Sequence, residues 1–138
     1  MAPWFSEPPA LNEVELSIFG PGYGEAIAVH TGNGNWLLVD SCIDADSGLP
    51  ASLRYLLRMG VDVAQRVKLI VATHWHDDHV RGMSGIYNAC TGAVLAISGA
   101  LQSKEFRKLV ALHSGGRLAQ SSGIDEFVRI FELLQSRR

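Results

Sequence analysis

Three of the five histidines of this chain lie within residues 74–79, whose sequence is HWHDDH. In extended backbone, residues i and i+2 project to the same side, so His74 and His76 can reach one cation together. Asp78 and His79 follow at the expected turn into a helix, where they can approach a neighbouring cation. Imidazole and carboxylate ligands favour zinc, with manganese or iron as alternatives. The segment therefore predicts a site for one or two metal ions.

The residues before this segment place it at the end of a strand. Residues 67–73, VKLIVAT, are nearly all apolar and rich in β-branched side chains, which is typical of a central strand covered on both faces. Open α/β sheets bind ligands at the carboxyl ends of their strands, which is where the histidines are expected to lie. Gly82, just beyond them, would let the backbone pass close to the site because it has no side chain.

Hydrophobic patterns in the rest of the sequence predict a mixed sheet with helices packed on it. Val14, Leu16 and Ile18 alternate with polar residues, which predicts a half-buried first strand. The turn at 32–35, GNGN, favours a hairpin because Asn and Gly tolerate positive φ. Ser122, paired with Asp125, resembles a capping box at the start of the last helix. The other expected elements are strands at 26–29, 36–39, 67–73 and 93–97 and helices at 50–60, 80–90, 106–113 and 122–134.

The composition indicates one globular domain. A chain of 138 residues has room for a single core, so we expect one domain at 11–138, preceded by an irregular, proline-rich arm at 1–10. The formal net charge is −2 and the basic residues are scattered, which argues against a surface for duplex DNA. No stretch is long and apolar enough to span a membrane, and no secretory signal is visible. Because the only cysteines are Cys42 and Cys90, a cytoplasmic location with reduced thiols is expected.

The segment from Thr73 to Gly82, THWHDDHVRG, matches the T-H-x-H-x-D-H-x-x-G motif of the metallo-β-lactamase superfamily without a gap, so the chain resembles that family. A strand that ends in aspartate, within residues 37–41, is similar to the one that opens the active-site loops of the family. Residues 22–25, followed by a strand, a Gly-Asn turn and Asp40, also resemble the hydrolase domain of competence-type DNA-uptake proteins.

This resemblance implies an α/β fold, the metallo-β-lactamase-like αββα sandwich, and a metal-dependent hydrolase. His74 and His76 would bind the first metal ion, and Asp78 and His79 the second. Asp78 would also orient the attacking water, and Asp40 would orient the ligand loop from behind. A metal-bound hydroxide would attack an ester-type or phosphodiester-type bond of a small molecule or of a nucleic acid, the latter expected only as a substrate.

The second half of the family fold supplies a further metal-binding histidine, a bridging aspartate and a last histidine, and the sequence shows no matching context for them. We therefore expect only the N-terminal half of the sandwich, with an apolar sheet face and an open edge uncovered. His113 is interpreted as a helix-end residue, with a third metal ligand as the alternative. The chain would then belong to a longer hydrolase, complete itself as a homo-oligomer, or be a truncated, non-catalytic metal-binding or interaction module.

Other residues near these patterns have weaker implications. Trp75, between two expected ligands, could line a substrate pocket or pack behind the loop. Cys42, two residues after Asp40, could approach the metal ions. His30 lies in a predicted strand and matches no motif. Residues 20–24, GPGYG, are interpreted as a turn rather than a nucleotide-binding loop, because a strand and not a helix follows them.

Overall fold

The structure, a computed structural model, describes residues 7–20, 22–99, 103–114 and 122–137. Its strands are β1 (Glu15–Phe19), β2 (Ala26–His30), β3 (Trp36–Val39), β4 (Val67–Ala72) and β5 (Val94–Ile97). Its helices are α1 (Ala51–Arg58), α2 (Val63–Arg66), α3 (Asp77–Val80), α4 (Met83–Ala89), α5 (Lys104–Ser114) and α6 (Ser122–Ser136).

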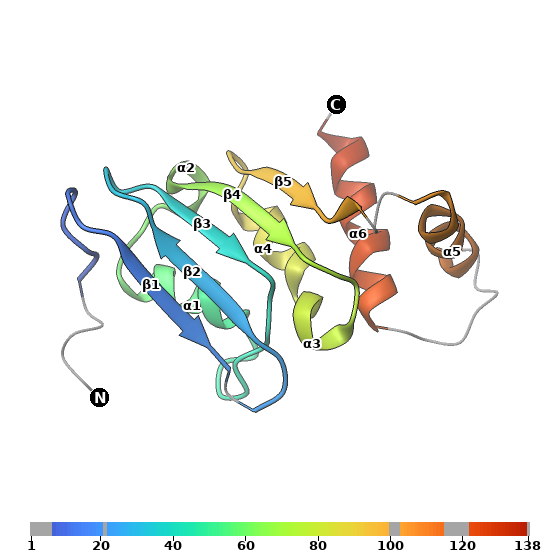
Figure 1. Cartoon of the computed structure of the whole chain (residues 1–138), viewed down its shortest axis with the longest axis horizontal. Helices are drawn as coiled ribbons and strands as arrows, with labels where there is room; N and C mark the ends of the chain where they lie inside the picture. Colours follow the sequence, from blue (N-terminus) through green and yellow to red (C-terminus); the bar gives the residue numbers. More distant parts are fainter. Residues whose placement is uncertain (1–6, 21, 100–102, 115–121, 138) are drawn as a thin grey trace.

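The strands form one sheet in the order β1-β2-β3-β4-β5 (Figure 1). β1, β2 and β3 pair antiparallel, whereas β4 pairs parallel with both β3 and β5. The hairpin predicted between β2 and β3 is present: the Thr31 N–H donates to the Asn35 carbonyl oxygen at 2.9 Å, and Asn33 has a φ of 55°. The mixed sheet with packed helices that the sequence predicts is therefore confirmed.

One face of the sheet carries the core, and the other face is open. Alternate strand residues pack beneath α1 and α4, among them Leu38 on β3 and Ile70 on β4, both 0% exposed (Figure 1). Leu16 and Ile18 on β1 and Val94 on β5 lie on the opposite face and are 61%, 69% and 66% exposed. The open apolar face expected for half of a sandwich is therefore present, and β1 and β5 form the edges of the sheet.

β1 is oriented opposite to the expectation from its pattern. A half-buried strand is ordinarily expected to bury its apolar residues, but Leu16 and Ile18 lie on the open face. The polar side of β1 is half-buried instead, since Glu15 accepts hydrogen bonds from the Tyr55 hydroxyl at 2.5 Å and the Ser17 hydroxyl at 2.8 Å. The alternation predicts the strand but not which of its two faces is covered, because the hydrogen-bond partner of Glu15 comes from a helix that is distant in sequence.

The helix predicted at roughly 80–90 is present as α4, which begins later than expected, at Met83, and a further one-turn helix that was not predicted, α3, precedes it. α3 begins earlier, at Asp77, and the helical conformation is interrupted at Arg81 and Gly82 before α4 begins. Gly82 has a φ of 81°, a conformation that other residues rarely adopt, and a Cβ atom there would lie 2.6 Å from Ile43 Cδ1. The absence of a side chain at Gly82 therefore makes room for the Ile43 side chain, in the loop that follows β3, whereas the expected approach of the Gly82 backbone to the metal site stays a prediction.

The other predicted elements agree with the structure within two residues at each end. α2 was not predicted; it is one turn, capped by the Asp62 side chain, which accepts from the Gln65 N–H. Residues 7–10 of the predicted arm form no helix or strand, and residues 1–6 and the Ser122 side chain lie outside the described part of the chain. No helix among the described residues is long and apolar enough to cross a bilayer. Cys42 and Cys90 are both unpaired and buried.

Candidate metal centre

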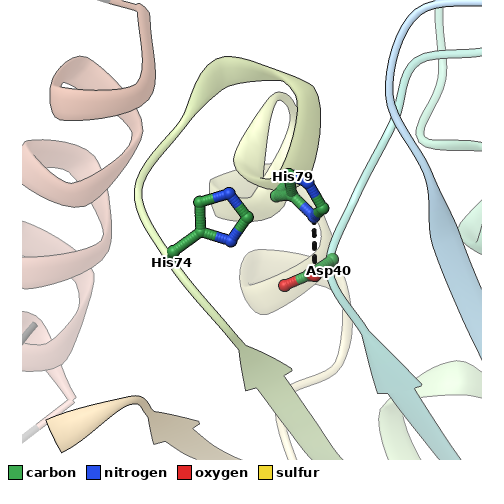
Figure 2. Close-up of side chains that lie close together, drawn as sticks. All are labelled: Asp40, His74 and His79. Carbon is green, nitrogen blue, oxygen red and sulfur yellow. Dashed lines mark hydrogen bonds and ion pairs between the residues drawn. The ribbon is translucent and has the colours of Figure 1, made fainter. Parts of the chain in front are cut away.

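The histidine cluster lies on the connection from β4 to α3. His74 and His76 follow β4, whereas Asp78 and His79 lie on α3. Figure 2 shows His74 and His79 side by side, with Asp40 beside them at the end of β3. The ring centroid of His74 lies 3.9 Å from that of His79 and 4.9 Å from that of His76. The cluster therefore lies at the carboxyl edge of the sheet, where the sequence predicts it.

Two overlapping groups of side chains have the donor atoms and the spacing to hold a metal ion. The ligand atoms of His74, His76 and Asp78 all lie within 4.8 Å of one another, and so do those of Asp40, His74 and His79. The sequence pattern paired Asp78 with His79 alone. The structure brings Asp78 to His74 and His76 as well, so one loop offers two imidazoles and a carboxylate. Three protein donors are the number that catalytic zinc sites use.

Asp40 connects the loop to the neighbouring strand. It directly follows β3, is 6% exposed, and has a φ of 55°, a left-handed conformation in which aspartate is more frequent than most residues. Its Oδ1 accepts from the Thr73 N–H at 2.8 Å. Its Oδ2 accepts from the Thr73 hydroxyl at 2.6 Å and from His79 Nδ1 at 2.9 Å. Because both oxygens are engaged, the geometry suits an orienting residue better than a metal ligand.

The hydrogen bonds around Asp40 select which ring nitrogen of each histidine is free. An ionised carboxylate only accepts, so the Thr73 hydroxyl donates its single proton to Asp40, and His79 Nδ1 carries a proton. The Thr73 oxygen then accepts from His74 Nδ1, which is 3.1 Å away. Each of the two imidazoles keeps its Nε2 lone pair, the arrangement that metal-binding histidines use. The motif includes Thr73, but the sequence alone shows no role for its hydroxyl.

A hydrogen-bond acceptor of Asp78 faces a hydrogen-bond acceptor of His79. Asp78 Oδ2 lies 3.6 Å from His79 Nε2, and the two side chains are 42% and 18% exposed. When the only ring proton is on Nδ1, a carboxylate oxygen opposes a nitrogen lone pair. That contact is favourable only with a positive charge between the atoms, either a second proton on the imidazole or a metal cation. The donor chemistry therefore fits a divalent cation.

The loop between β1 and β2 adds a contact that the motif does not reveal. The Glu25 N–H donates to the Asp78 carbonyl oxygen at 3.0 Å, and Glu25 Oε1 lies 4.0 Å from His79 Nδ1. The Glu25 side chain is 66% exposed, so its carboxylate lies at the rim of the site. In the sequence, only the resemblance of residues 22–25 to one branch of hydrolases drew attention to Glu25. No local pattern connects Glu25 to the histidines.

The sequence left the roles of two residues, Trp75 and Cys42, open. Trp75 packs on the core cluster, and its ring centroid lies 6.4 Å from that of Phe106, which favours packing over lining a pocket. Cys42 belongs to neither donor group found among the described residues. Burial, with the nearby Asp44 and Glu25 carboxylates, raises the pKa of the Cys42 thiol above its ordinary value, so its thiolate form is disfavoured.

The two remaining histidines do not contribute described side chains to the cluster. His30 is 0% exposed on β2, where it pairs with Trp36 at the start of β3, whereas Asp40 follows the end of that strand. Its Nδ1 lies 2.9 Å from the Glu13 carbonyl oxygen. His113 lies in α5, and its side chain falls outside the described part of the structure, so neither its interpretation as a helix-end residue nor the alternative of a third metal ligand is tested.

The chain is similar to solved structures of subclass B3 and related metallo-β-lactamases. The metallo-β-lactamase SMB-1, bound to 2-mercaptoethanesulfonate, is 24% identical over 66% of this chain and 34% of its own, with a TM-score of 0.44. BJP-1, a subclass B3 metallo-β-lactamase of Bradyrhizobium japonicum, is 25% identical over 66% of this chain and 33% of its own, with a TM-score of 0.45. The chain thus spans about a third of the length of these proteins. A comparison with curated proteins finds no match.

The family model described as the metallo-β-lactamase superfamily matches residues 19–105, which is more than half of the chain. The matched range contains all of β2 to β5, Asp40 and the whole histidine cluster. It ends at the start of α5 and leaves α6 outside. On this match the chain belongs to the metallo-β-lactamase superfamily.

Proposed function

We propose that this chain supplies a metal centre for a hydrolase that uses a divalent metal ion. The observation that carries the proposal is the group His74, His76 and Asp78, whose ligand atoms lie within 4.8 Å of one another. Further support comes from the hydrogen bonds of Asp40 and Thr73, which leave the Nε2 atoms of His74 and His79 free. The proposed metal is zinc, as one or two ions, with manganese or iron as alternatives, because imidazole and carboxylate donors suit these ions.

The residues of the loop have distinct proposed roles. A bound ion would supply Lewis-acid polarisation of the substrate and would acidify a water molecule. His74 and His76 would hold that ion together with one oxygen of Asp78. The partly exposed Asp78 carboxylate would also accept a hydrogen bond from the attacking water and so orient it. Asp40 keeps the His79 ring turned so that Nε2 points toward Asp78.

The proposed bond is of the ester or phosphodiester type. The stretch at 22–25 and the strand that ends at Asp40 resemble the hydrolase domain of competence-type DNA-uptake proteins, which favours a phosphodiester. The backbone of this same stretch contacts the loop, since the Glu25 N–H donates to the Asp78 carbonyl oxygen at 3.0 Å. A nucleic acid would then be a substrate of the centre rather than a ligand of a basic surface, because the net charge is −2.

A non-catalytic metal-binding module is the second candidate. The donors found among the described residues come from one loop and from Asp40, whose oxygens are already engaged. A metal ion held only at this edge would bind and stabilise the loop without a complete substrate site. The open apolar face of the sheet favours an interaction role for such a module.

Turnover and metal content together separate the two candidates. The chain is loaded with zinc, its metal content is measured, and the release of nitrophenol from a nitrophenyl phosphodiester and from a nitrophenyl acetate is followed. The hydrolase proposal expects turnover of one substrate that chelation abolishes and that Asp78→Asn lowers by at least about 100-fold, because the change removes a proposed metal ligand as well as the group that accepts a hydrogen bond from the attacking water. Stoichiometric zinc without turnover of either substrate leaves only the metal-binding module. A chain that binds no zinc contradicts both.

A further inference from the structure

α6 lies outside the segment that matches the family model. Its first turn nevertheless contacts the segment from Thr73 to Gly82, which carries the proposed ligands and is here called the metal-binding loop. Gly123 is buried there, and a Cβ atom at this position would overlap the Trp75 carbonyl oxygen and would lie 3.4 Å from the Asp77 backbone nitrogen. Trp75 is the residue between His74 and His76. A residue without a side chain is therefore needed for α6 to approach the backbone that carries the expected ligands.

One turn further along α6, Glu126 binds the other end of the same loop. Its carboxylate is buried, with 6% of the residue exposed. Oε1 accepts from the Gly82 N–H at 3.0 Å, and Oε2 accepts from the Ser84 N–H at 2.9 Å. These N–H groups lie at the start of α4, where a helix leaves its first donors without intrahelical partners. Arg129, at 3.5 Å from Oε1, adds an opposite charge from the solvent side.

The far end of α6 contacts the far end of α4. The Arg137 guanidinium donates to the Tyr87 carbonyl oxygen at 2.8 Å and lies 4.2 Å from the centroid of the Tyr87 ring. A carboxylate thus lies at the N-terminus of α4 and a cation at its C-terminus, which is the favourable arrangement for the dipole of that helix. α6 therefore fixes α4 at both ends, and α4 begins directly after the metal-binding motif.

We propose that α6 positions the metal-binding loop, with Glu126 as the positioning residue and Gly123 as its point of close contact. Glu126 touches no expected ligand, so it acts through the backbone of Gly82 and Ser84. The effect on metal affinity rests on the proposed function, because it presupposes that the loop binds a metal ion. The effect on the backbone does not, because Gly82 and Ser84 are held whether or not a metal is bound.

The test compares Glu126→Gln with Glu132→Gln, a matched change at an exposed position of the same helix. The glutamine keeps the size of the side chain but can accept only one of the two N–H bonds with its oxygen. Amide hydrogen exchange at Gly82 and Ser84 is measured by NMR without metal, and Co²⁺ binding is measured from its visible absorption spectrum. We expect at least tenfold faster exchange and about tenfold weaker Co²⁺ binding in Glu126→Gln, with a changed spectrum. Glu132→Gln should match the wild type in all readouts.

The outcomes separate failure of this proposal from failure of the proposed function. Unchanged exchange at Gly82 and Ser84 in Glu126→Gln overturns the positioning role, whatever the metal does. If the wild type binds Co²⁺ and Glu126→Gln binds it equally tightly with the same spectrum, α6 does not position the ligands. If the wild type binds no Co²⁺, the proposed function fails, and the exchange data alone decide the role of Glu126. Should Glu126→Gln not fold, Arg129→Gln, which leaves both N–H bonds intact, must raise exchange at Gly82 and Ser84 by a smaller factor.

Discussion

The loop that carries the proposed metal ligands is held from two sides by contacts of different kinds. On the sheet side, Asp40 binds side chains and backbone of the loop, including the His79 ring and the Thr73 hydroxyl. On the helix side, Gly123 and Glu126 reach only backbone atoms, namely the Trp75 carbonyl and the N–H groups at the start of α4. The sheet side lies within the residues that match the family model, whereas the helix side lies outside them.

The two sides therefore have different roles. The sheet side orients the ligand side chains, and the helix side places the backbone of the loop. Asp40 determines which nitrogen of His79 is free, and through Thr73 it does the same for His74. α6 determines where the backbone runs but leaves the rings free to rotate. Changes on the sheet side should therefore weaken metal binding most, and changes on the helix side should act more on the stability of the loop.

Among changes outside the proposed metal ligands, Asp40→Asn should have the largest effect on metal affinity. The amide nitrogen of asparagine replaces one acceptor oxygen, so either the Thr73 N–H loses its partner on Oδ1, or the Thr73 hydroxyl and His79 Nδ1 both lose theirs on Oδ2. We expect zinc affinity to fall by about 100-fold, at the upper end of the range for residues that orient ligands. The free energy of unfolding should also fall, by about 1–3 kcal/mol, because a buried donor is left unsatisfied. Equilibrium dialysis and urea unfolding measure the two effects, and an affinity within twofold of the wild type would contradict the orienting role.

Thr73→Val should have an intermediate effect. Valine keeps the shape of threonine but removes the hydroxyl that links Asp40 Oδ2 with His74 Nδ1. His79 keeps its bond to Asp40, so only one of the two rings loses its orientation. Zinc affinity is expected to fall by about tenfold. Thr91→Val, remote from the site in sequence, serves as the control, and an equal loss of affinity in both variants would show that the Thr73 hydroxyl has no specific role.

Gly123→Ala should lower the stability of the protein more than its zinc affinity, the reverse of the expectation for Asp40→Asn. The new methyl group overlaps the Trp75 carbonyl oxygen, so α6 or the loop must move. We expect the free energy of unfolding to fall by about 1–3 kcal/mol, as for other overpacked sites, with a loss of zinc affinity below about tenfold. Gly85→Ala, where a Cβ atom meets nothing within 4 Å, is the matched control. If Gly123→Ala weakens zinc binding more than Asp40→Asn does, the division of roles between the two sides is wrong.

Cys42→Ala should have the smallest effect on metal affinity. Cys42 lies two residues after Asp40, but its thiol belongs to neither donor group of the described residues, and burial raises its pKa. We expect zinc affinity within twofold of the wild type, together with a modest loss of stability from the buried side chain. A clear fall in zinc affinity, measured by the same dialysis, would instead identify Cys42 as a ligand.

The local parts of this candidate site could be predicted from the sequence because its donor residues are concentrated in one short segment. The spacing of His74, His76 and Asp78 after an apolar strand indicated a metal site at the carboxyl edge of a sheet, and the structure brings these residues together. Asp40 was found because the family resemblance includes the strand that it ends. The succession of strands and helices predicted a mixed sheet, and the parallel pairing of β4 with β3 and β5 agrees with it.

The parts that the sequence did not predict depend on contacts between distant residues. Glu126 follows another acidic residue, Asp125, in α6, and its buried position depends on the start of α4 lying opposite it. A possible signal was its helical spacing: three residues after Gly123 and four before Ile130, Glu126 shares the buried face of α6 with both. The open face of β1 was missed because the Tyr55 hydroxyl, which binds Glu15, comes from α1. A pattern of polar and apolar residues cannot show which polar residues find partners.

The most direct test of the central claim is zinc binding by two neighbouring aspartate variants. Asp77 and Asp78 are adjacent on α3, but only Asp78 shares a donor group with His74 and His76 among the described residues. Equilibrium dialysis with zinc is predicted to show near-stoichiometric binding for the wild type and for Asp77→Asn. Asp78→Asn and the double variant His74→Ala/His76→Ala should lose that binding. A wild type that binds no zinc, or equal binding by all the variants, would contradict a metal centre at this loop.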